Sequence, residues 1–498
     1  MQKAAGSKSI SNDQVAQMPV EFDAAEEGRV RRKLDRHMMP IFFVLCGYLS
    51  NKRLASCRDT NEIINTDMLA FLDRSNIGNA KIAGMSKDLH LSGHQYSWLL
   101  TIFYITYVVF EFSLLFWKVF PPHIVGATVV FGWGLIATVQ SAAQNWGGMM
   151  ATRFLLGAFE AAYGPGIIYL LSFFYLRHEV GFRCGLFASA APLASTFAGA
   201  LAYGITSGHS KFPPWRLLFL VEGLATIVMI PFAWIFIPDS PEKARFLTEE
   251  ETQVVRARTA RQVGTAERAR HLKTKEFILA LVDFKVWFNA LMYFSANVSY
   301  ASLPLYLPTI LADMGYSNIN AQGLSASPYF TAFLFALITT WLADRTQQRG
   351  LVLVVTSIVG GIGYVVLATV KTVGVRYFAT FLAAAGVFST IPNILAWTLN
   401  NQGSDSRRGA GLVLINVIGQ CGPILGTNLY PASQAPRYVE GMSVCAAFMF
   451  FTALLSIGLR TLLVWRNNKL DEQYGKQVTE DKAAIGAENY GPNFRYVL

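Results

Sequence analysis

The chain has 498 residues, of which 53% are hydrophobic and 15% are charged, and its mean hydropathy is positive. This composition argues against a soluble or disordered protein and indicates a membrane protein. The formal net charge of +10 is explained by basic loops on one side of the membrane, so it indicates no nucleic-acid partner.

Apolar runs of about 20 residues, the length that spans a bilayer core, follow one another along the chain. The first, Val44 to Asn76, is interrupted by a polar passage, whereas the later ones are continuous. The continuous runs lie at about residues 94–116, 123–143, 147–172, 183–206, 216–237, 284–311, 325–343, 351–370, 375–398, 409–431 and 442–465. Because these runs are long and do not alternate with polar residues, they predict twelve transmembrane helices and exclude a β-barrel.

The polar passage in the first run extends from Gly47 to Asp67 and contains six charged residues. Each charge at a bilayer centre costs about 2.5–3.5 kcal/mol, so the passage cannot cross the membrane as a helix. Its removal would join "HMMPIFFVLC" to "MLAFLDRSN" in one apolar helix. Two interpretations follow: a retained intron or gene-prediction error, or a genuine loop that bulges from a kinked first helix.

A second polar passage separates the sixth and seventh spans. The resulting division into six and six helices is typical of secondary transporters, in which two repeated halves surround a central cavity. The expected fold class is an all-α membrane protein of this kind. The expected parts are an N-terminal cytoplasmic tail (1–33), an N-terminal half (34–237) with the insertion (47–67), a cytoplasmic linker with two short helices (238–283), a C-terminal half (284–466) and a cytoplasmic tail (467–498).

Alternate loops are basic, as short cytoplasmic loops are. They include "YLRHEVGFRCG", "ADRTQQRG" and "SDSRRGAG", whereas "SAAQNW" on the other side contains no Lys or Arg. Both termini are therefore expected in the cytoplasm. We expect a monomeric, multi-pass protein of the plasma membrane without a cleavable signal peptide.

The chain lacks the sequence signatures of metal sites, ATP-driven transport and enzymatic catalysis. The five cysteines stand in no metal-like spacing, so neither a disulfide framework nor a metal site is expected. The chain has no G-x-x-x-x-G-K-[ST] motif, which argues against ATP-driven transport. No catalytic triad or nucleotide motif is present, so we expect neither an enzyme nor a cofactor.

Long motifs carry a resemblance to a known family. They are "FLDRSNIGNAKIAGM" at 71–85, "RFLLGAFEAAYGPGIIYLLSFFY" at 153–175, "WRLLFLVEG" and "IPDSPEKARFLTEEE" at 215–251, "WLADRTQQRG", and "NNQGSDSRRGAGLVLINVIGQCGPILGTNLYP" at 400–431. With these motifs the chain resembles the major facilitator superfamily and, within it, the fungal allantoate permease branch of the anion:cation symporters, which includes nicotinate transporters. The resemblance implies a twelve-helix major facilitator bundle. It also favours the retained intron, because Asp35 and Asp73 are farther apart than in relatives by the length of the insertion.

Ionisable residues inside the spans are expected to face a cavity, a partner or a transport path. Arg74 is a candidate anchor for a substrate carboxylate, because its planar guanidinium matches two oxygens. The alternative is a structural ion pair. Asp73 and Glu160 are candidate proton-coupling groups, and the resemblance implies that Glu160 matches a proton site of the anion symporters. Arg153, two turns before Glu160, is expected to neutralise a carboxylate structurally.

Other charged residues in the spans have expected structural roles. Asp344, Arg345 and Arg349 match a loop signature of the superfamily, which implies that they gate alternating access. Glu222 is expected in an ion-pair set, and Glu111 is a further carboxylate in the membrane. The corresponding loop of the first half, "LFWKVFPPH", lacks the expected acidic and arginine pattern.

Aromatic and amide residues on the seventh, tenth and eleventh spans are candidates for lining the cavity. Some amides only join helices in membranes. With Arg74, the substrate-binding candidates are Tyr293, Asn297, Tyr300, Asn393, Trp397 and Asn416.

The expected function is secondary active transport by alternating access, with proton-coupled symport of a small organic anion such as a nicotinate-like or allantoate-like carboxylate. The expected partners are this anion, protons and the lipid bilayer. One alternative is export of an acidic secondary metabolite. Another is a non-transporting sensor, or a transporter inactivated by the insertion. The fifth span, "ASAAPLASTFAGALAYG", lacks the "GPxxGG" motif of proton antiporters, which favours symport.

Overall fold

The computed structural model describes residues 24–43, 66–176, 179–208, 210–263, 278–279, 281–402, 405–475 and 494–498. Every regular element in these ranges is helical, which confirms the predicted all-α class. Ten helices there are long and apolar enough to cross a membrane. They are Gly93–Val119, Pro122–Gln140, Trp146–Leu171, Phe182–Ser207, Pro214–Phe236, Asn318–Thr346, Arg349–Thr369, Val373–Asn400, Gly409–Gly426 and Val439–Tyr474.

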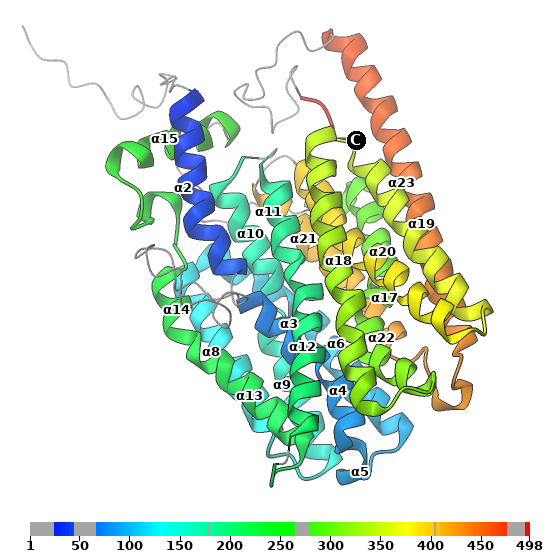
Figure 1. Ribbon diagram of the computed structural model, residues 1–498. Helices are drawn as coiled ribbons and strands as arrows, with labels where there is room; N and C mark the ends of the chain where they lie inside the picture. Colours follow the sequence, from blue (N-terminus) through cyan, green and yellow to red (C-terminus); the bar gives the residue numbers. More distant parts are fainter. Residues whose placement is uncertain are drawn as a thin grey trace, which may run out of the picture.

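Helices α2 to α14 form the N-terminal half (Figure 1). Their bounds are α2 Ala24–Phe43, α3 Thr66–Ser75, α4 Ile77–Ala80, η1 Lys81–Met85, α5 Ser86–Asp88, α6 Gly93–Phe110, η2 Glu111–Leu115, α7 Phe116–Val119, α8 Pro122–Gln140, α9 Trp146–Glu160, α10 Gly164–Phe174, α11 Val180–Ala188, α12 Ala190–Ser207, α13 Pro214–Val228 and α14 Ile230–Phe236. The linker that follows contains η3 Pro241–Lys243 and α15 Glu249–Val263.

Helices α17 to α23 form the C-terminal half. Their bounds are α17 Phe284–Asp313, α18 Asn318–Thr346, α19 Arg349–Thr369, α20 Val373–Asn400, α21 Asp405–Gly419, α22 Cys421–Gly426, η4 Ala432–Gln434 and α23 Val439–Tyr474. Helix α17 remains helical for 30 residues although it contains Pro304 and Pro308. Neighbouring helices in a bundle compensate for the backbone bonds that such prolines remove.

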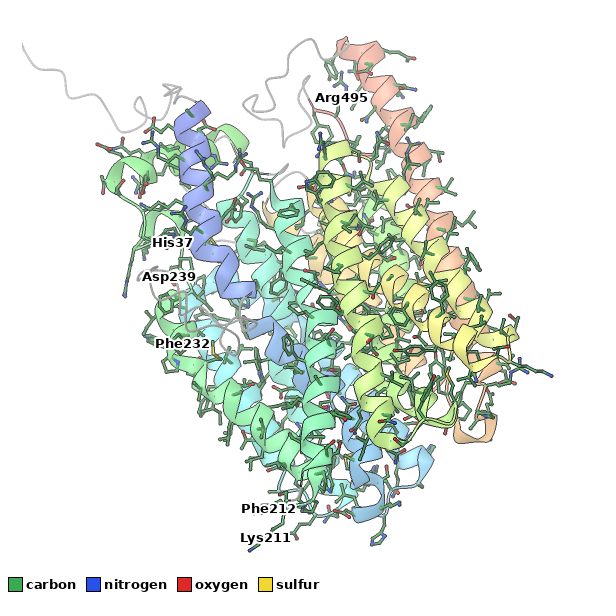
Figure 2. All side chains as sticks on the ribbon, in the orientation of Figure 1. His37, Lys211, Phe212, Phe232, Asp239 and Arg495 are labelled. Carbon is green, nitrogen blue, oxygen red and sulfur yellow. The ribbon has the colours of Figure 1, made fainter. Side chains whose placement is uncertain are left out.

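The two halves stand side by side, with the helices of each running between two ends of the bundle (Figure 1). We call the end where α2 begins and α23 ends the tail end, and Arg495 marks it in Figure 2. The opposite end, marked by Lys211 and Phe212 between α12 and α13, is the far end.

Glycines allow the two halves to pack closely toward both ends of the bundle. Toward the far end, a Cβ atom on Gly78 of α4 would lie 2.6 Å from the carbonyl oxygen of Leu305 in α17. Toward the tail end, a Cβ atom on Gly185 of α11 would lie 2.0 Å from Cγ2 of Thr340 in α18. Helices approach this closely in membranes where small residues face one another. These contacts bound the space between the halves from both sides.

The interrupted first helix appears as two helices, α2 and α3. Residues 44–65 lie outside the described residues, so the interpretation of 47–67 as an insertion stays a prediction. In Figure 1, α3 starts close to the end of α2, and the two helices contact each other. The last two residues of the predicted insertion, Thr66 and Asp67, belong to α3.

Ion pairs attach α2 to the N-terminal half, so part of the predicted N-terminal tail is structured. Lys33 Nζ lies 2.5 Å from Oε2 of Glu251 in α15, and Asp35 Oδ2 lies 2.6 Å from Nη2 of Arg183 in α11. Burial alone would raise the pKa of the Glu251 carboxyl, but hydrogen bonds, that of Lys33 foremost, outweigh it and hold this pKa below its usual range.

The linker helix α15 also belongs structurally to the N-terminal half. Arg258 of α15 is 3% exposed, and its Nη2 lies 2.5 Å from Oε2 of Glu179, which is equally buried. The prediction of two short helices in the linker falls partly on residues 264–277, which lie outside the described part of the chain, so it stays a prediction.

Candidate substrate site

A cavity of about 90 Å³ lies between the two halves. The N-terminal half contributes residues from α3, α6, α9, α10, α11 and α12, and the C-terminal half contributes residues from α17 and α20 to α22. The lining residues are Phe71, Arg74, Tyr104, Tyr107, Glu160, Tyr163, Gly164, Pro165, Ile168, Phe187, Ala188, Ala191, Tyr293, Asn297, Tyr300, Ala301, Ile391, Leu395, Asn416, Gln420 and Pro423.

An ion pair between Arg74 and Glu160 forms the charged part of this cavity. Nε and Nη2 of Arg74 both donate to Oε2 of Glu160, at 3.1 and 2.9 Å. The Arg74 side chain is 18% exposed, whereas that of Glu160 is 1% exposed. The other carboxylate oxygen of Glu160, Oε1, is buried and has no hydrogen-bond partner among the described residues. Two adjacent guanidinium nitrogens thus already hold a carboxylate oxygen in the cavity.

Two aromatic rings of α6 pack beside the Arg74 guanidinium. Its central carbon lies 5.2 Å from the ring centroid of Phe103 and 5.0 Å from that of Tyr107. Such cation–π contacts stabilise a partly desolvated guanidinium by about 0.5–2 kcal/mol. The rings also restrict the orientation of the guanidinium, so that its donors point toward Glu160 and the cavity.

The end of α9 places Glu160 in the cavity. The helix ends at Glu160, and α10 begins four residues later at Gly164, followed by Pro165. Proline is tolerated in the first turn of a helix but not in the interior, so this sequence favours a break between two helices. The carboxylate therefore lies at the junction of α9 and α10, which together make the membrane span Trp146–Leu171.

The C-terminal half provides an uncharged polar and aromatic wall. Tyr293, Asn297 and Tyr300 recur at helical spacing on one face of α17. Asn297 Nδ2 donates to the carbonyl oxygen of Gly419 at 3.2 Å, and Asn416 Nδ2 donates to Leu412 at 2.8 Å. The Tyr300 ring packs at 4.8 Å from that of Phe388.

Three of the predicted substrate-binding and proton-coupling residues lie outside the cavity lining. Asn393 is fully buried and donates to the carbonyl oxygen of Ser389 one turn earlier at 2.9 Å. Trp397 donates from its indole nitrogen to the carbonyl oxygen of Val497 at 2.8 Å. Asp73 is 1% exposed, and its Oδ2 accepts a hydrogen bond from Thr226 Oγ1 at 3.2 Å. We therefore do not include these three side chains in the proposed substrate contacts.

Asp73 instead belongs to a buried charged cluster inside the N-terminal half. Nη1 of Arg153 lies 3.5 Å from the carbonyl oxygen of Asp73, and the Arg153 guanidinium packs at 5.6 Å from the Phe219 ring. Oε1 of Glu222 accepts a hydrogen bond from Asn76 Nδ2 at 2.5 Å. This cluster joins α3, α9 and α13, and the structural role of Arg153 stays a prediction.

The predicted gate residues lie at the tail end and differ in burial and in their contacts. Arg349 is fully buried and binds Asp344 through Nη2. Asp344 Oδ2 also accepts the backbone N–H of Phe182 in α11 at 3.1 Å, so it joins the two halves. Arg345 is exposed, and its guanidinium lies 5.3 Å from the ring centroid of Trp341 on the same helix.

Sequence reasoning missed the aromatic residues of α6. Tyr104 and Tyr107 line the cavity, and Phe103 supports Arg74. These rings lie in a span that also has exposed aromatic residues, so their spacing alone did not separate the two groups. The tyrosine hydroxyls, uncommon in a membrane interior, were the available signal.

A second cavity, of about 430 Å³, lies toward the far end between η1, α5, α12 and α18. Lys81 and Lys87 are among its lining residues, which include no Asp or Glu. The Lys81 ammonium lies 4.5 Å from the ring centroid of Tyr96 and 5.7 Å from that of Tyr306, one ring from each half. This cavity therefore carries positive charge.

Two helical halves that share a central cavity with charged and aromatic walls define a multi-pass membrane transporter. The chain belongs to the Major Facilitator Superfamily, whose sequence profile matches residues 66–427. It is 30% identical to the "MFS-type transporter efuF" of Hormonema carpetanum, over 98% of this chain and 96% of that protein. It is 29% identical to the high-affinity nicotinic acid transporter of Saccharomyces cerevisiae, over 86% and 77%. Its fold is similar to that of the proton:xylose symporter XylE, with a TM-score of 0.62, 12% identity and coverage of 80% of this chain and 93% of that one.

Proposed function

We propose that this transporter carries a small organic anion with a carboxylate group together with a proton. The observation that carries the proposal is the ion pair of Arg74 and Glu160 in the central cavity. A substrate carboxylate and the Glu160 carboxylate compete for the same two guanidinium nitrogens, because a guanidinium fork is matched by one planar pair of oxygens.

Protonation of Glu160 resolves this competition. When Glu160 takes up a proton, it loses its negative charge and releases Arg74, which then binds the substrate anion. When the anion leaves, Arg74 and Glu160 pair again only after the proton has also left. Because an unpaired guanidinium or carboxylate in a desolvated cavity is costly, states that carry the anion alone or the proton alone are disfavoured, and the two are transported together.

The walls of the cavity favour a small, flat substrate. Tyrosines from both halves, Tyr107, Tyr293 and Tyr300, line a cavity that contains about 90 Å³. Aromatic side chains pack well against a planar ring, and Asn297 and Asn416 are near for hydrogen bonds to a ring nitrogen or amide. A pyridine carboxylate of the nicotinate kind fits this chemistry. The similarity to a nicotinic acid transporter and the resemblance to the allantoate permease branch support the same substrate class.

We propose that the tail end faces the cytoplasm of a cell whose plasma membrane contains this protein, because the basic loops lie at this end. The far end then faces outward, with Lys81 and Lys87 around the second cavity. Positive charge at a cleft raises the local concentration of anions, which supports import rather than export.

Proteoliposomes with an alkaline interior test the coupling. The parent protein should accumulate labelled nicotinate in proportion to the pH gradient. Glu160→Gln mimics the protonated acid, so it should lose pH-driven accumulation while it still exchanges internal for external nicotinate. Undiminished pH-driven accumulation by Glu160→Gln would refute the proposed role of Glu160. If substitution of Arg74 left the rate of nicotinate exchange unchanged, the proposed substrate site would be refuted.

A further inference from the structure

Residues 494–498, with the sequence Phe-Arg-Tyr-Val-Leu, pack against the tail end of the C-terminal half. They have no regular secondary structure, yet Phe494 is 1% exposed and Tyr496 is 6% exposed. Figure 2 shows Arg495 at this end, beside the helices of the C-terminal half. The segment is therefore docked on the bundle.

Two asparagines bind the backbone of the segment. Asn467 of α23 accepts the N–H of Tyr496 at 2.8 Å and donates to its carbonyl oxygen at 2.9 Å. Asn401, directly after α20, accepts the N–H of Val497 and donates to its carbonyl oxygen, both at 3.0 Å. Each asparagine side chain pairs with both the N–H and the C=O of one backbone residue. These are the hydrogen bonds that a neighbouring β-strand would make with an extended peptide. The pairs therefore recognise an extended peptide.

Side-chain contacts add sequence preference to this backbone recognition. Arg495 Nε lies 2.6 Å from Oδ1 of Asp471 in α23. The Tyr496 ring centroid lies 5.0 Å from the ammonium nitrogen of Lys285 in α17. A peptide with an arginine followed by an aromatic residue satisfies both contacts.

The docked segment is adjacent to the contact between the two halves. The N–H of Gly350 donates to the carbonyl oxygen of Leu498 at 3.2 Å. The preceding residue, Arg349, binds Asp344, which accepts the N–H of Phe182 from the other half. One peptide bond thus separates the segment from the chain of contacts that closes the tail end.

We propose that Asn401, Asn467, Asp471 and Trp397 form a peptide-binding site whose ligand is the chain's own 494–498 segment, and that its occupancy holds the Arg349–Asp344–Phe182 contact in place. Release of the segment removes the hydrogen bond to Gly350 and loosens this contact. A competing peptide of the same kind would therefore promote opening of the tail end, whichever substrate is transported.

Amide hydrogen exchange of the full chain in lipid nanodiscs tests the proposal. The double variant Asn401→Ala, Asn467→Ala should exchange the Tyr496 and Val497 amides at least about tenfold faster, since each loses its acceptor. Fragments that contain Phe182 should also exchange several-fold faster. Asn468→Ala alters an exposed neighbour on α23 and should change neither. Arg495→Ala, which alters only the ligand and leaves the site intact, should act in the same direction as the double variant.

Three results would overturn the proposal. Rapid exchange of Tyr496 and Val497 in the parent protein would show that the segment is not docked. Release of the segment by Arg495→Ala with an unchanged rate at Phe182 would show that the segment does not hold the gate. An equal effect of Asn468→Ala would show that the changes reflect general destabilisation of α23.

Discussion

Gly157 of α9 lies directly against the backbone of Phe103 in α6. A Cβ atom at position 157 would stand 2.4 Å from the Phe103 carbonyl oxygen. Glu160 follows Gly157 by three residues, and Tyr104 and Tyr107 follow Phe103, so this contact sets the spacing between the carboxylate and the aromatic residues of the cavity.

Gly157→Ala should therefore reduce both stability and transport without any change in charge. An added methyl group against backbone forces the helices apart and costs about 1–3 kcal/mol. The thermal midpoint of the purified protein should fall, and nicotinate uptake should fall with it. Gly374→Ala on α20, where a Cβ would meet nothing within 4 Å, is the matched control. Equal midpoints for both variants would contradict the expected close contact.

Substitution of Arg74 separates charge from geometry. Arg74→Lys keeps a positive charge but loses the two-nitrogen fork, so the half-saturation concentration for nicotinate should rise about tenfold, equivalent to about 1.4 kcal/mol. Arg74→Ala should remove saturable uptake. Arg466→Lys, at an exposed arginine on α23, should match the parent. If Arg74→Ala retained the parent affinity, Arg74 would be structural and the carboxylate would be bound elsewhere.

Glu111 offers a control for the proton site. Both of its carboxylate oxygens are buried, and neither has a hydrogen-bond partner among the described residues. An ionised carboxylate in such a place would cost several kcal/mol, so we expect the neutral acid throughout the transport cycle. Glu111→Gln should consequently preserve pH-driven accumulation in the assay that Glu160→Gln fails. Loss of coupling in Glu111→Gln alone would move the proton site from Glu160 to Glu111.

The insertion in the first helix makes a prediction about expression. Deletion of residues 47–67 should join α2 and α3 in one continuous membrane-spanning helix that carries Arg74. Surface biotinylation in a transport-deficient yeast should then show more protein at the plasma membrane, with higher uptake, than the 498-residue form. If the 498-residue form reaches the surface and transports equally well, the passage is a genuine loop.

Much of the architecture was predictable because membrane helices are long and apolar. Ten of the twelve predicted spans coincide with the ten membrane-length helices, the seventh coincides with α17, and the first lies partly outside the described residues. The superfamily was identified from motifs whose order along the chain is distinctive. Arg74 and Glu160 could also be chosen as candidate functional residues from their positions inside spans. Their contact could not be predicted, because 86 residues separate them and no local pattern records which helices face each other.

Trp397 shows the limit of sequence reasoning most clearly. A tryptophan in a predicted span has the same neighbours in sequence whether it faces a cavity or another segment. Its hydrogen bond goes to Val497, 100 residues away, in a segment that sequence reasoning treated as a tail. The same limit applies to Asn393. Its amide donates to a carbonyl oxygen of its own helix, and the sequence does not distinguish such an amide from one that faces the cavity.

Under the proposed mechanism, the pairing of Arg74 with Glu160 also determines which energy source the transporter can use. In the empty cavity, Arg74 carries one positive charge and Glu160 carries one negative charge. In the loaded cavity, the proton neutralises Glu160 and the substrate anion supplies the negative charge, so the net charge is the same. A membrane voltage does no net work on a carrier whose loaded and empty forms have equal charge. Accumulation would then depend only on the pH difference across the membrane, at about tenfold per pH unit. It would persist in a depolarised cell but cease when the pH is equal on both sides.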